Sequence, residues 1–200
     1  MDGTVYKSGQ ANSFPNLLSQ QFATIGGGAF TQPSFEEDVN NLGGIQGFAG
    51  TRLVINASAG GVQNIAGAST ITLTPQAKAY NNMGVPGAKS FHLGLQGYAA
   101  LNPYFARHAT SPTASVIGDA VSLNPTFFTN WIGANDVLAY ATTGGIGVNQ
   151  TGNLNPATYG MNDITDPTVF ASVYSQIINA LTVNGAKGVV ATIPSVTSIP

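Results

Sequence analysis

The sequence has 200 residues, a formal net charge of −2 and only 7% charged residues. This length is enough for one domain with a hydrophobic core, and the charge leaves no basic surface of the kind that binds nucleic acid. The absence of cysteine excludes disulfides and a cysteine nucleophile. Because charged side chains are few, Asn, Gln, Ser, Thr and Gly must cover the surface, a composition common in secreted and cell-surface proteins.

Two helices are predicted near the start of the chain. Ser13-Phe14-Pro15 combines a capping serine with a proline in the first turn, and the glycines at 26–28 end this helix. Ser34 followed by Glu37 has the capping-box spacing of a second, short helix that ends at residues 43–44.

Strands and a loop are predicted in the middle of the chain. Residues 51–57 and 69–74 are rich in β-favouring side chains and predict two strands, with the glycines at 60–61 forming a hairpin or a surface connection. The glycine and proline content of residues 80–90 predicts a loop that leads into helical sequence over residues 91–98.

The next part of the chain predicts a helix, a strand and a second helix in succession. Residues 115–123 are helical in pattern, and residues 126–132 are aromatic and β-favouring, as in a strand buried on both faces. A helix begins at residues 136–141. Residues 142–165 are rich in Gly, Asn and Thr without a clear period, which predicts a long loop insertion.

The C-terminal part predicts an amphipathic helix followed by a strand. Asp166-Pro167 is a helix start, and Gly185 is the expected stop. The apolar residues between them recur at helical spacing: Phe170, Val173, Tyr174, Ile177, Ile178 and Leu181. Residues 187–193 predict a short buried strand. The strand at 126–132, this helix and the last strand therefore form a βαβ unit, which indicates the α/β class with a parallel sheet.

Polar residues at two places suggest a site for acyl transfer. Gly133, Asn135 and Asp136 follow a predicted strand, where ligands bind in open α/β sheets. The backbone N–H of Gly87 and the side-chain amide of Asn135 are neutral donors, which stabilise the oxyanion of a tetrahedral intermediate. Glycine also lets the backbone approach a substrate closely.

A purely structural interpretation competes with this one. Gly84, Pro86 and Gly87 could simply form a turn, and Asn135 and Asp136 could simply begin a helix. For either motif alone the structural interpretation is favoured, because short Gly/Asn patterns recur by chance.

Both motifs belong to a longer series of segments with a common order. The segments are Ser8-Gly9-Gln10, Asn12-Ser13-Phe14-Pro15, Asn81-Asn82-Met83-Gly84-Val85-Pro86-Gly87-Ala88, Asn102-Pro103-Tyr104-Phe105-Ala106-Arg107, Trp131-Ile132-Gly133-Ala134-Asn135-Asp136 and Asn184-Gly185-Ala186-Lys187-Gly188-Val189-Val190. In this order and spacing, the set resembles the SGNH (GDSL-like) family of serine esterases and lipases, particularly secreted or lipoprotein members from the Bacteroidetes.

The resemblance implies a flavodoxin-like, three-layer fold with a mainly parallel sheet. It assigns the backbone N–H of Gly87 and the side chain of Asn135 to the oxyanion hole. Gly84 is the less suited of the two loop glycines for that role. Gly133 matches the glycine of the same block as Asn135, and Asp136 is expected to support the loop rather than to perform chemistry.

The family's nucleophile and base have no match in the chain. The Gly-Asp/Asn-Ser-Leu block would precede Met1, and the Asp-x-x-His block would follow Pro200. We therefore expect residues 1–200 to be a partial, inactive hydrolase domain. The resemblance implies a small-molecule, lipid or glycan ester as substrate, without a metal or organic cofactor. It also implies a secreted, periplasmic or outer-membrane-associated protein, attached to a membrane only if a lipoprotein signal lies outside this sequence.

Other residues of the chain are poor candidates to replace the missing nucleophile and base. Ser8 and Ser13 do not follow a strand-to-helix elbow of the kind that exposes a nucleophile. His92 is expected to be a packed helix residue and His108 a surface or loop residue, so neither is expected to act as a base.

Two further possibilities concern metals and non-catalytic binding. Asp163 and Asp166 are close in sequence but lack a third ligand, and Asp166 is already explained as a helix cap. The alternative function is a non-catalytic surface or carbohydrate-binding protein on the same scaffold, because a fold does not dictate chemistry. The serine and histidine blocks in the flanking sequence would distinguish the two.

Overall fold

The computed structural model describes residues 6–34, 41–44, 50–68 and 78–196. The α-helices are α1 (Lys7–Ala11), α2 (Phe14–Ala23), α3 (Pro103–Ala106), α4 (Val116–Ser122), α5 (Ala134–Thr142) and α6 (Pro167–Thr182). The strands are β1 (Leu53–Asn56), β2 (Gly61–Asn64), β3 (Phe127–Asn130) and β4 (Lys187–Val190). Short 3-10 helices are η1 (Ala57–Ala59), η2 (Ser90–His92), η3 (Tyr98–Ala100) and η4 (Pro156–Thr158). Among these residues, no helix combines the length and apolar character needed to cross a membrane.

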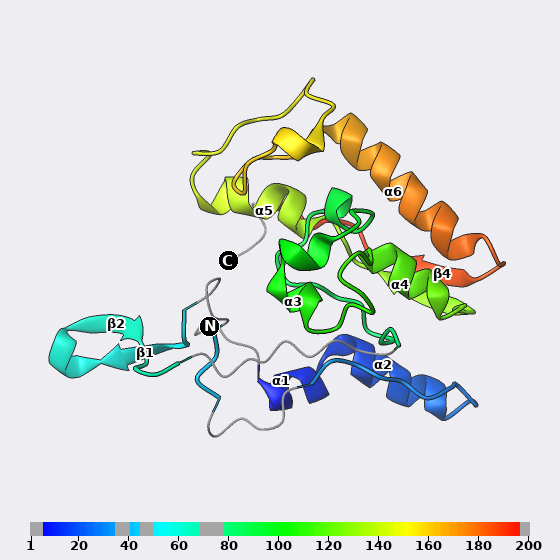
Figure 1. Ribbon diagram of the computed structural model, residues 1–200, viewed down its shortest axis with the longest axis horizontal. Coiled ribbons are helices and arrows are strands. Elements are labelled where there is room, and N and C mark those ends of the chain that lie inside the picture. The colour runs from blue at the N-terminus through cyan, green and yellow to red at the C-terminus, as the bar shows by residue number, and fades with distance from the viewer. Residues whose placement is uncertain (1–5, 35–40, 45–49, 69–77, 197–200) are drawn as a thin grey trace.

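The described residues form a mixed α/β structure with two small sheets, which confirms the α/β class. Strands β1 and β2 pair antiparallel as a hairpin that projects away from the helices (Figure 1). Strands β3 and β4 pair parallel, with Phe127 opposite Lys187 and Asn130 opposite Val190. The predicted parallel pairing of the two flanking strands of the βαβ unit is therefore confirmed.

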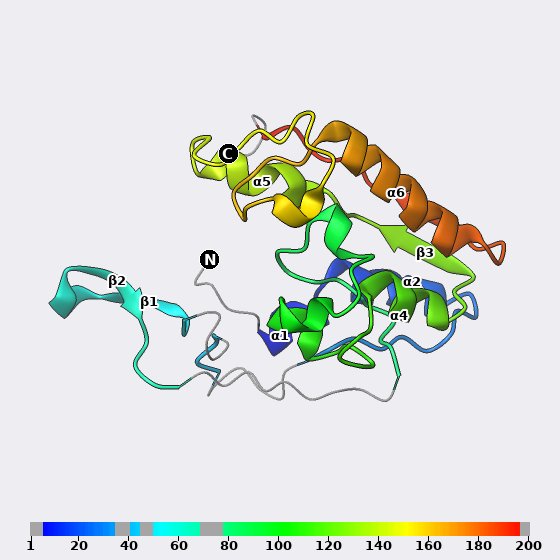
Figure 2. The ribbon, with the colours of Figure 1, turned by 45° about the horizontal axis from the view of Figure 1, so that its top comes forward.

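Strand β3 lies between α6 and α2 (Figure 2). Its alternating side chains explain this arrangement, since successive residues of a strand point to opposite faces. The rings of Phe127 and Trp131 contact those of Phe22 and Phe14 in α2 at centroid distances of 5.1 and 5.6 Å. Phe128, from the opposite face, packs against the buried core.

The core lies between the segment 88–109, α4 and α6. Its buried apolar side chains share one cluster: Ala88, Leu93, Tyr98, Phe105, Ala109, Val116, Ile177 and Leu181. The predicted stripe of α6 supplies the last two, which confirms its helical period. Asp166 caps this helix by accepting hydrogen bonds from the N–H groups of Thr168 and Val169, also as predicted.

The burial expected of the two parallel strands is wrong. All four residues of β4 are exposed, with Val189 at 58% and Val190 at 50%. Trp131, in the segment predicted to be buried on both faces, is 58% exposed. The physical reason is that the β3–β4 sheet has only two strands among the described residues, so no further strand or layer covers β4.

Two local predictions differ from the structure, one is confirmed and two fall outside the described residues. Ser13 precedes α2, but its hydroxyl donates to the side-chain oxygen of Gln32 and makes no cap hydrogen bond. Residues 91–98 contain no α-helix, because Gly97 at φ +75° separates two 3-10 turns. The predicted strand at 51–57 is confirmed as β1, and its partner in the hairpin is β2. The predicted strand at 69–74 lies outside the described residues, as does most of the helix predicted after Ser34.

Candidate functional site

The two motifs singled out in the sequence lie against each other. The side-chain amide of Asn135, in the first turn of α5, donates to the backbone carbonyl of Ala88 over 2.9 Å. The carboxylate of Asp136 accepts two hydrogen bonds from Ser90, one from the backbone N–H and one from the hydroxyl, each 2.8 Å long. Side-chain contacts therefore join the loop at 84–90 directly to the start of α5, although 47 residues separate Asn135 from Ala88.

Gly87 occupies the tip of a turn beside this junction. Its φ is +76°, and the N–H of Ala88 donates to the carbonyl of Val85 across the turn. A proline followed by a glycine with positive φ is the sequence of a type II turn. Gly87 is exposed, and its N–H has no partner among the described residues. The N–H of Gly84, in contrast, donates to the side-chain oxygen of Asn82 over 3.0 Å, which leaves Gly87 as the glycine with an open donor.

Gly133 is required where β3 turns into α5. Its φ of +123° is rarely adopted by residues with a side chain. A Cβ atom there would lie 2.6 Å from Cδ1 of Ile193 and 3.0 Å from the ring of Phe170. The chain can therefore begin α5 close to α6 only with glycine at this position, and that closeness places Asn135 and Asp136 beside the loop.

Asp136 is buried at the start of α5, where it hydrogen-bonds Ser90 of the loop at 84–90 and Thr165 of the segment before α6. Its side chain is 2% exposed, and its backbone carbonyl accepts from the N–H of Thr165 over 3.0 Å. Burial raises the pKa of the carboxyl group, whereas the hydrogen bonds from Ser90 act in the opposite direction. The side chain faces loop atoms rather than solvent, as a supporting role requires.

Lys89 is a functional candidate that sequence patterns did not reveal. It is 4% exposed, and its ammonium donates to the backbone carbonyls of Asp163 at 2.6 Å and Gly160 at 3.4 Å. Burial lowers its pKa, and the charges of Asp136 and Asp163 counteract this. A single lysine in a loop has no periodicity to interpret. Its position two residues after Gly87 was the one available signal.

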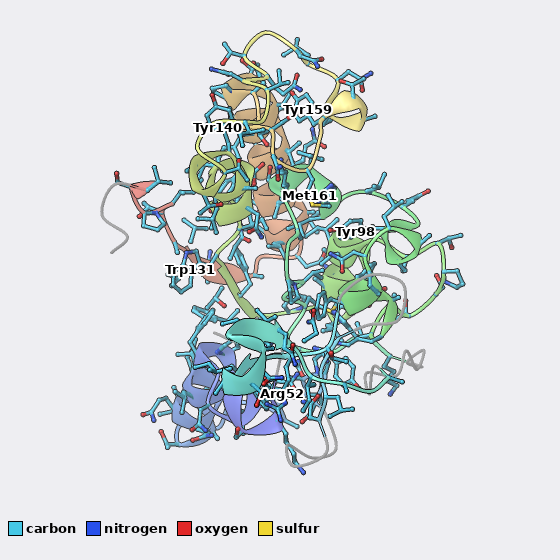
Figure 3. The ribbon with its side chains drawn as sticks, turned by 90° about the vertical axis from the view of Figure 1, so that its left-hand side faces the viewer. Arg52, Tyr98, Trp131, Tyr140, Tyr159 and Met161 are labelled. Carbon is cyan, nitrogen blue, oxygen red and sulfur yellow. The ribbon has the colours of Figure 1, made fainter. Side chains whose placement is uncertain are left out.

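The loop predicted at 142–165 contacts this site through its C-terminal half. In Figure 3, the part of the loop that carries Tyr159 and Met161 lies beside the segment that carries Tyr98. The rings of Tyr159 and Phe91 meet edge-on at 5.5 Å. The carboxylate of Asp163 accepts hydrogen bonds from the N–H groups of Val148 and Gly160, which lower its pKa and give the loop an internal framework.

His92 is half-buried and His108 is fully buried, and neither is placed for proton transfer with a serine. Nδ1 of His92 accepts from the N–H of Lys89 over 3.0 Å, and its ring stacks on Tyr98. Burial, together with the nearby ammonium of Lys89, lowers the pKa of His92 to about 4. Among the described residues, neither histidine hydrogen-bonds a serine.

The expectation of a surface or loop position for His108 is wrong. Its side chain is fully buried, between the rings of Phe105 and Tyr80, and both ring nitrogens lack a hydrogen-bond partner among the described residues. Burial and the neighbouring charge of Arg107 lower its pKa to about 4. The turn after α3 explains this position. The N–H of His108 donates to the carbonyl of Phe105 over 2.9 Å, so the chain keeps winding beyond α3 and His108 follows Phe105 into the core.

The described part of the chain offers hydrogen-bond donors at this site rather than a group of metal ligands. Within the ranges 6–34, 41–44, 50–68 and 78–196, no three His, Asp or Glu side chains are grouped so that they could hold a metal ion. Comparison of the chain with protein-family models, with curated proteins and with solved structures found no match. The chemistry of the site therefore rests on the contacts of its own residues: an open backbone N–H at Gly87 and an amide at Asn135, next to a buried polar network.

Proposed function

We propose that this chain is part of an SGNH-type serine hydrolase that cleaves carboxylic esters through an acyl-enzyme. The observation that carries the proposal is the 2.9 Å hydrogen bond from Asn135 to the carbonyl of Ala88, which holds the amide next to the turn of Gly87. On this proposal, strands β3 and β4 belong to a larger, mainly parallel flavodoxin-like sheet. The proposal requires a nucleophilic serine and a histidine base from outside residues 1–200.

The donors available at this junction suit an oxyanion. An asparagine amide has two N–H groups. One of them binds Ala88, and the other has no partner among the described residues. The N–H of Gly87, one residue before Ala88, is also open. Neutral donors fixed in advance stabilise the negative oxygen of a tetrahedral intermediate without reorganising during the reaction.

The proposed reaction needs no metal or organic cofactor. The serine oxygen bonds to the ester carbonyl carbon, and histidine takes the serine proton and passes it to the departing alcohol as the ester C–O bond breaks. Water then attacks the acyl-enzyme and releases the acid. During both steps, Gly87 and Asn135 would bind the oxygen that carries the negative charge. The proposed substrates are small-molecule, lipid or glycan esters, encountered outside the cytoplasm.

The test is turnover of p-nitrophenyl acetate by the full-length protein that contains this chain. Asn135→Ala removes one oxyanion donor, and we expect kcat to fall by about 10²-fold or more. Asn155→Ala is a matched control, because this exposed asparagine only caps the short helix η4. An unchanged rate in Asn135→Ala, or an equal loss in both variants, would contradict the assignment.

A second candidate function is carbohydrate binding without catalysis. One observation favours it: Trp131 is 58% exposed just before the site, and an exposed aromatic face is suited to an apolar ring surface. Trp131 is the only tryptophan in the sequence, so its fluorescence reports directly on an oligosaccharide titration. Saturable quenching without ester turnover by the full-length protein would favour the binding protein over the hydrolase.

A further inference from the structure

Lys89 is the most buried of the positively charged side chains, and its ammonium has hydrogen-bond acceptors next to the site. Its ammonium contacts backbone carbonyls of the segment 160–163, which is more than 70 residues away in sequence. Buried lysines require such partners, because an unpaired buried charge is costly. An ammonium has three donors and no acceptor, so it can join several carbonyls at one point.

Three segments meet around Lys89. The loop at 87–90 binds the start of α5 through Asn135 and Asp136. The start of α5 binds the segment 160–165 through the N–H of Thr165, and Lys89 links that segment back to the loop at 87–90. The hydrogen bonds thus form a closed ring of three segments, and Lys89 is one of its three links.

We propose that Lys89 is a positioning residue that holds the segment 160–163 against the loop at 87–90 and thereby fixes the N–H of Gly87 and the amide of Asn135. The catalytic consequence rests on the proposed function, whereas the structural link does not. Lys89 touches neither donor, and it acts through the backbone that it fixes. The segment 160–163 is therefore part of the framework that supports the site.

The surroundings of the ammonium explain why a lysine is suited to this place. The carboxylates of Asp136 and Asp163 lie close enough to stabilise its charge. The carboxylate of Asp163 also accepts from the N–H of Gly160 over 2.6 Å, which folds the turn so that both carbonyls face Lys89. A neutral side chain of the same length would leave these carbonyls without their donor.

The link is tested first in the isolated chain, by amide hydrogen exchange followed residue by residue with NMR. In Lys89→Met we expect the amides of Ser90 and Thr165, which bind Asp136, to exchange about 10-fold faster or more, since local opening exposes them. Asp119→Asn is the matched control, because Asp119 is also buried but binds Thr110, outside the ring. Unchanged exchange in Lys89→Met, or an equal change in the control, would overturn the proposal.

A second variant keeps the test decisive if Lys89→Met does not fold. Asp163→Asn leaves the lysine in place and weakens the turn that presents its carbonyl acceptors. The amides of Ser90 and Thr165 should again exchange faster than in the unmodified chain. If Asp163→Asn folds with both amides fully protected, the link is not what holds the segments together.

The catalytic consequence is tested in the full-length protein with p-nitrophenyl acetate. In Lys89→Met we expect kcat to fall by about 10-fold or more, with KM nearly unchanged, since small displacements of catalytic groups have large effects. Lys89→Arg, which keeps the charge, should restore part of kcat, whereas Asp119→Asn should leave it unchanged. An equal fall in kcat for the control would overturn the positioning role. If the unmodified full-length protein hydrolyses no ester, the proposed function fails, and the exchange experiment still decides on the link.

Discussion

Two buried polar regions of this molecule differ in whether their polar atoms have hydrogen-bond partners. Lys89 and Asp136 are 4% and 2% exposed, and both are hydrogen-bonded: the ammonium of Lys89 donates to the carbonyl of Asp163, and the carboxylate of Asp136 accepts from Ser90. His108 is fully buried, and within the part of the chain that the structure describes neither ring nitrogen has a hydrogen-bond partner. The first region can hold distant segments in one arrangement, whereas the second contributes only through packing against Phe105 and Tyr80.

The difference follows from the cost of burying polar groups. A buried group that keeps its hydrogen bonds contributes modestly to stability, but removing its partner exposes the full desolvation penalty. A buried histidine without partners is tolerated while it is neutral and becomes unfavourable when it gains a proton. The two regions should therefore respond to different perturbations, the first to mutation of a partner and the second to pH.

The largest expected effect is that of Asp136→Ala. This change leaves the N–H and the hydroxyl of Ser90 buried without their acceptor. We expect the free energy of unfolding to fall by about 4 kcal/mol in urea denaturation, because two buried donors each lose their acceptor at a cost of about 2 kcal/mol. Asp136→Asn keeps the volume and one acceptor oxygen, so it should lose less. A loss within about 0.5 kcal/mol of zero for the alanine variant would show that the network does not stabilise the fold.

The second effect is the pH dependence due to His108. Its pKa in the folded protein is about 4, below the ordinary value of 6.5, because of burial and the nearby charge of Arg107. Between these values the unfolded state binds more protons, so stability is complete above the ordinary pKa and decreases as the pH falls towards 4. The loss approaches about 3 kcal/mol.

The variant His108→Phe isolates this contribution, since it keeps an aromatic ring against Phe105 and Tyr80 but cannot gain a proton. Urea denaturation at several pH values should show a shallower decrease for this variant than for the unmodified chain. His92, whose pKa is also about 4, adds to the slope in both proteins. Equal slopes in the two proteins would mean that His108 is not protonated on unfolding.

The smallest expected effect is that of Gly87→Ala, in the turn next to the hydrogen-bonded region of Lys89 and Asp136. Its φ of +76° disfavours alanine, but a Cβ atom would enter open space. We therefore expect a loss of about 1 kcal/mol, from backbone strain alone, in urea denaturation. Gly94→Ala is the control, because Gly94 has no positive φ and a Cβ atom there also enters open space, so it should lose less. A larger loss in Gly94→Ala would contradict the geometry of the turn.

Local sequence signals predicted those parts of the fold that depend on neighbours in the chain. The start of α6 at Asp166 and its apolar stripe involve spacings of a few residues, and both are found in the structure. That Asn135 lies beside the turn of Gly87 is expected only from the resemblance, which assigns both residues to one oxyanion hole. Exposure of β4 could not be predicted, because it depends on what covers the strand rather than on its own residues.

By itself, the sequence determined the α/β class, most of the helix boundaries and the two motifs that supply the donors of the candidate site. Only the tertiary structure decided that Lys89 links the loop at 87–90 to residues 160–163, and that His108 is buried with no hydrogen bond to any described residue. The reason is physical: capping and periodicity act over one or two helical turns. A buried charge or imidazole, in contrast, is defined by atoms that the fold brings from far along the chain.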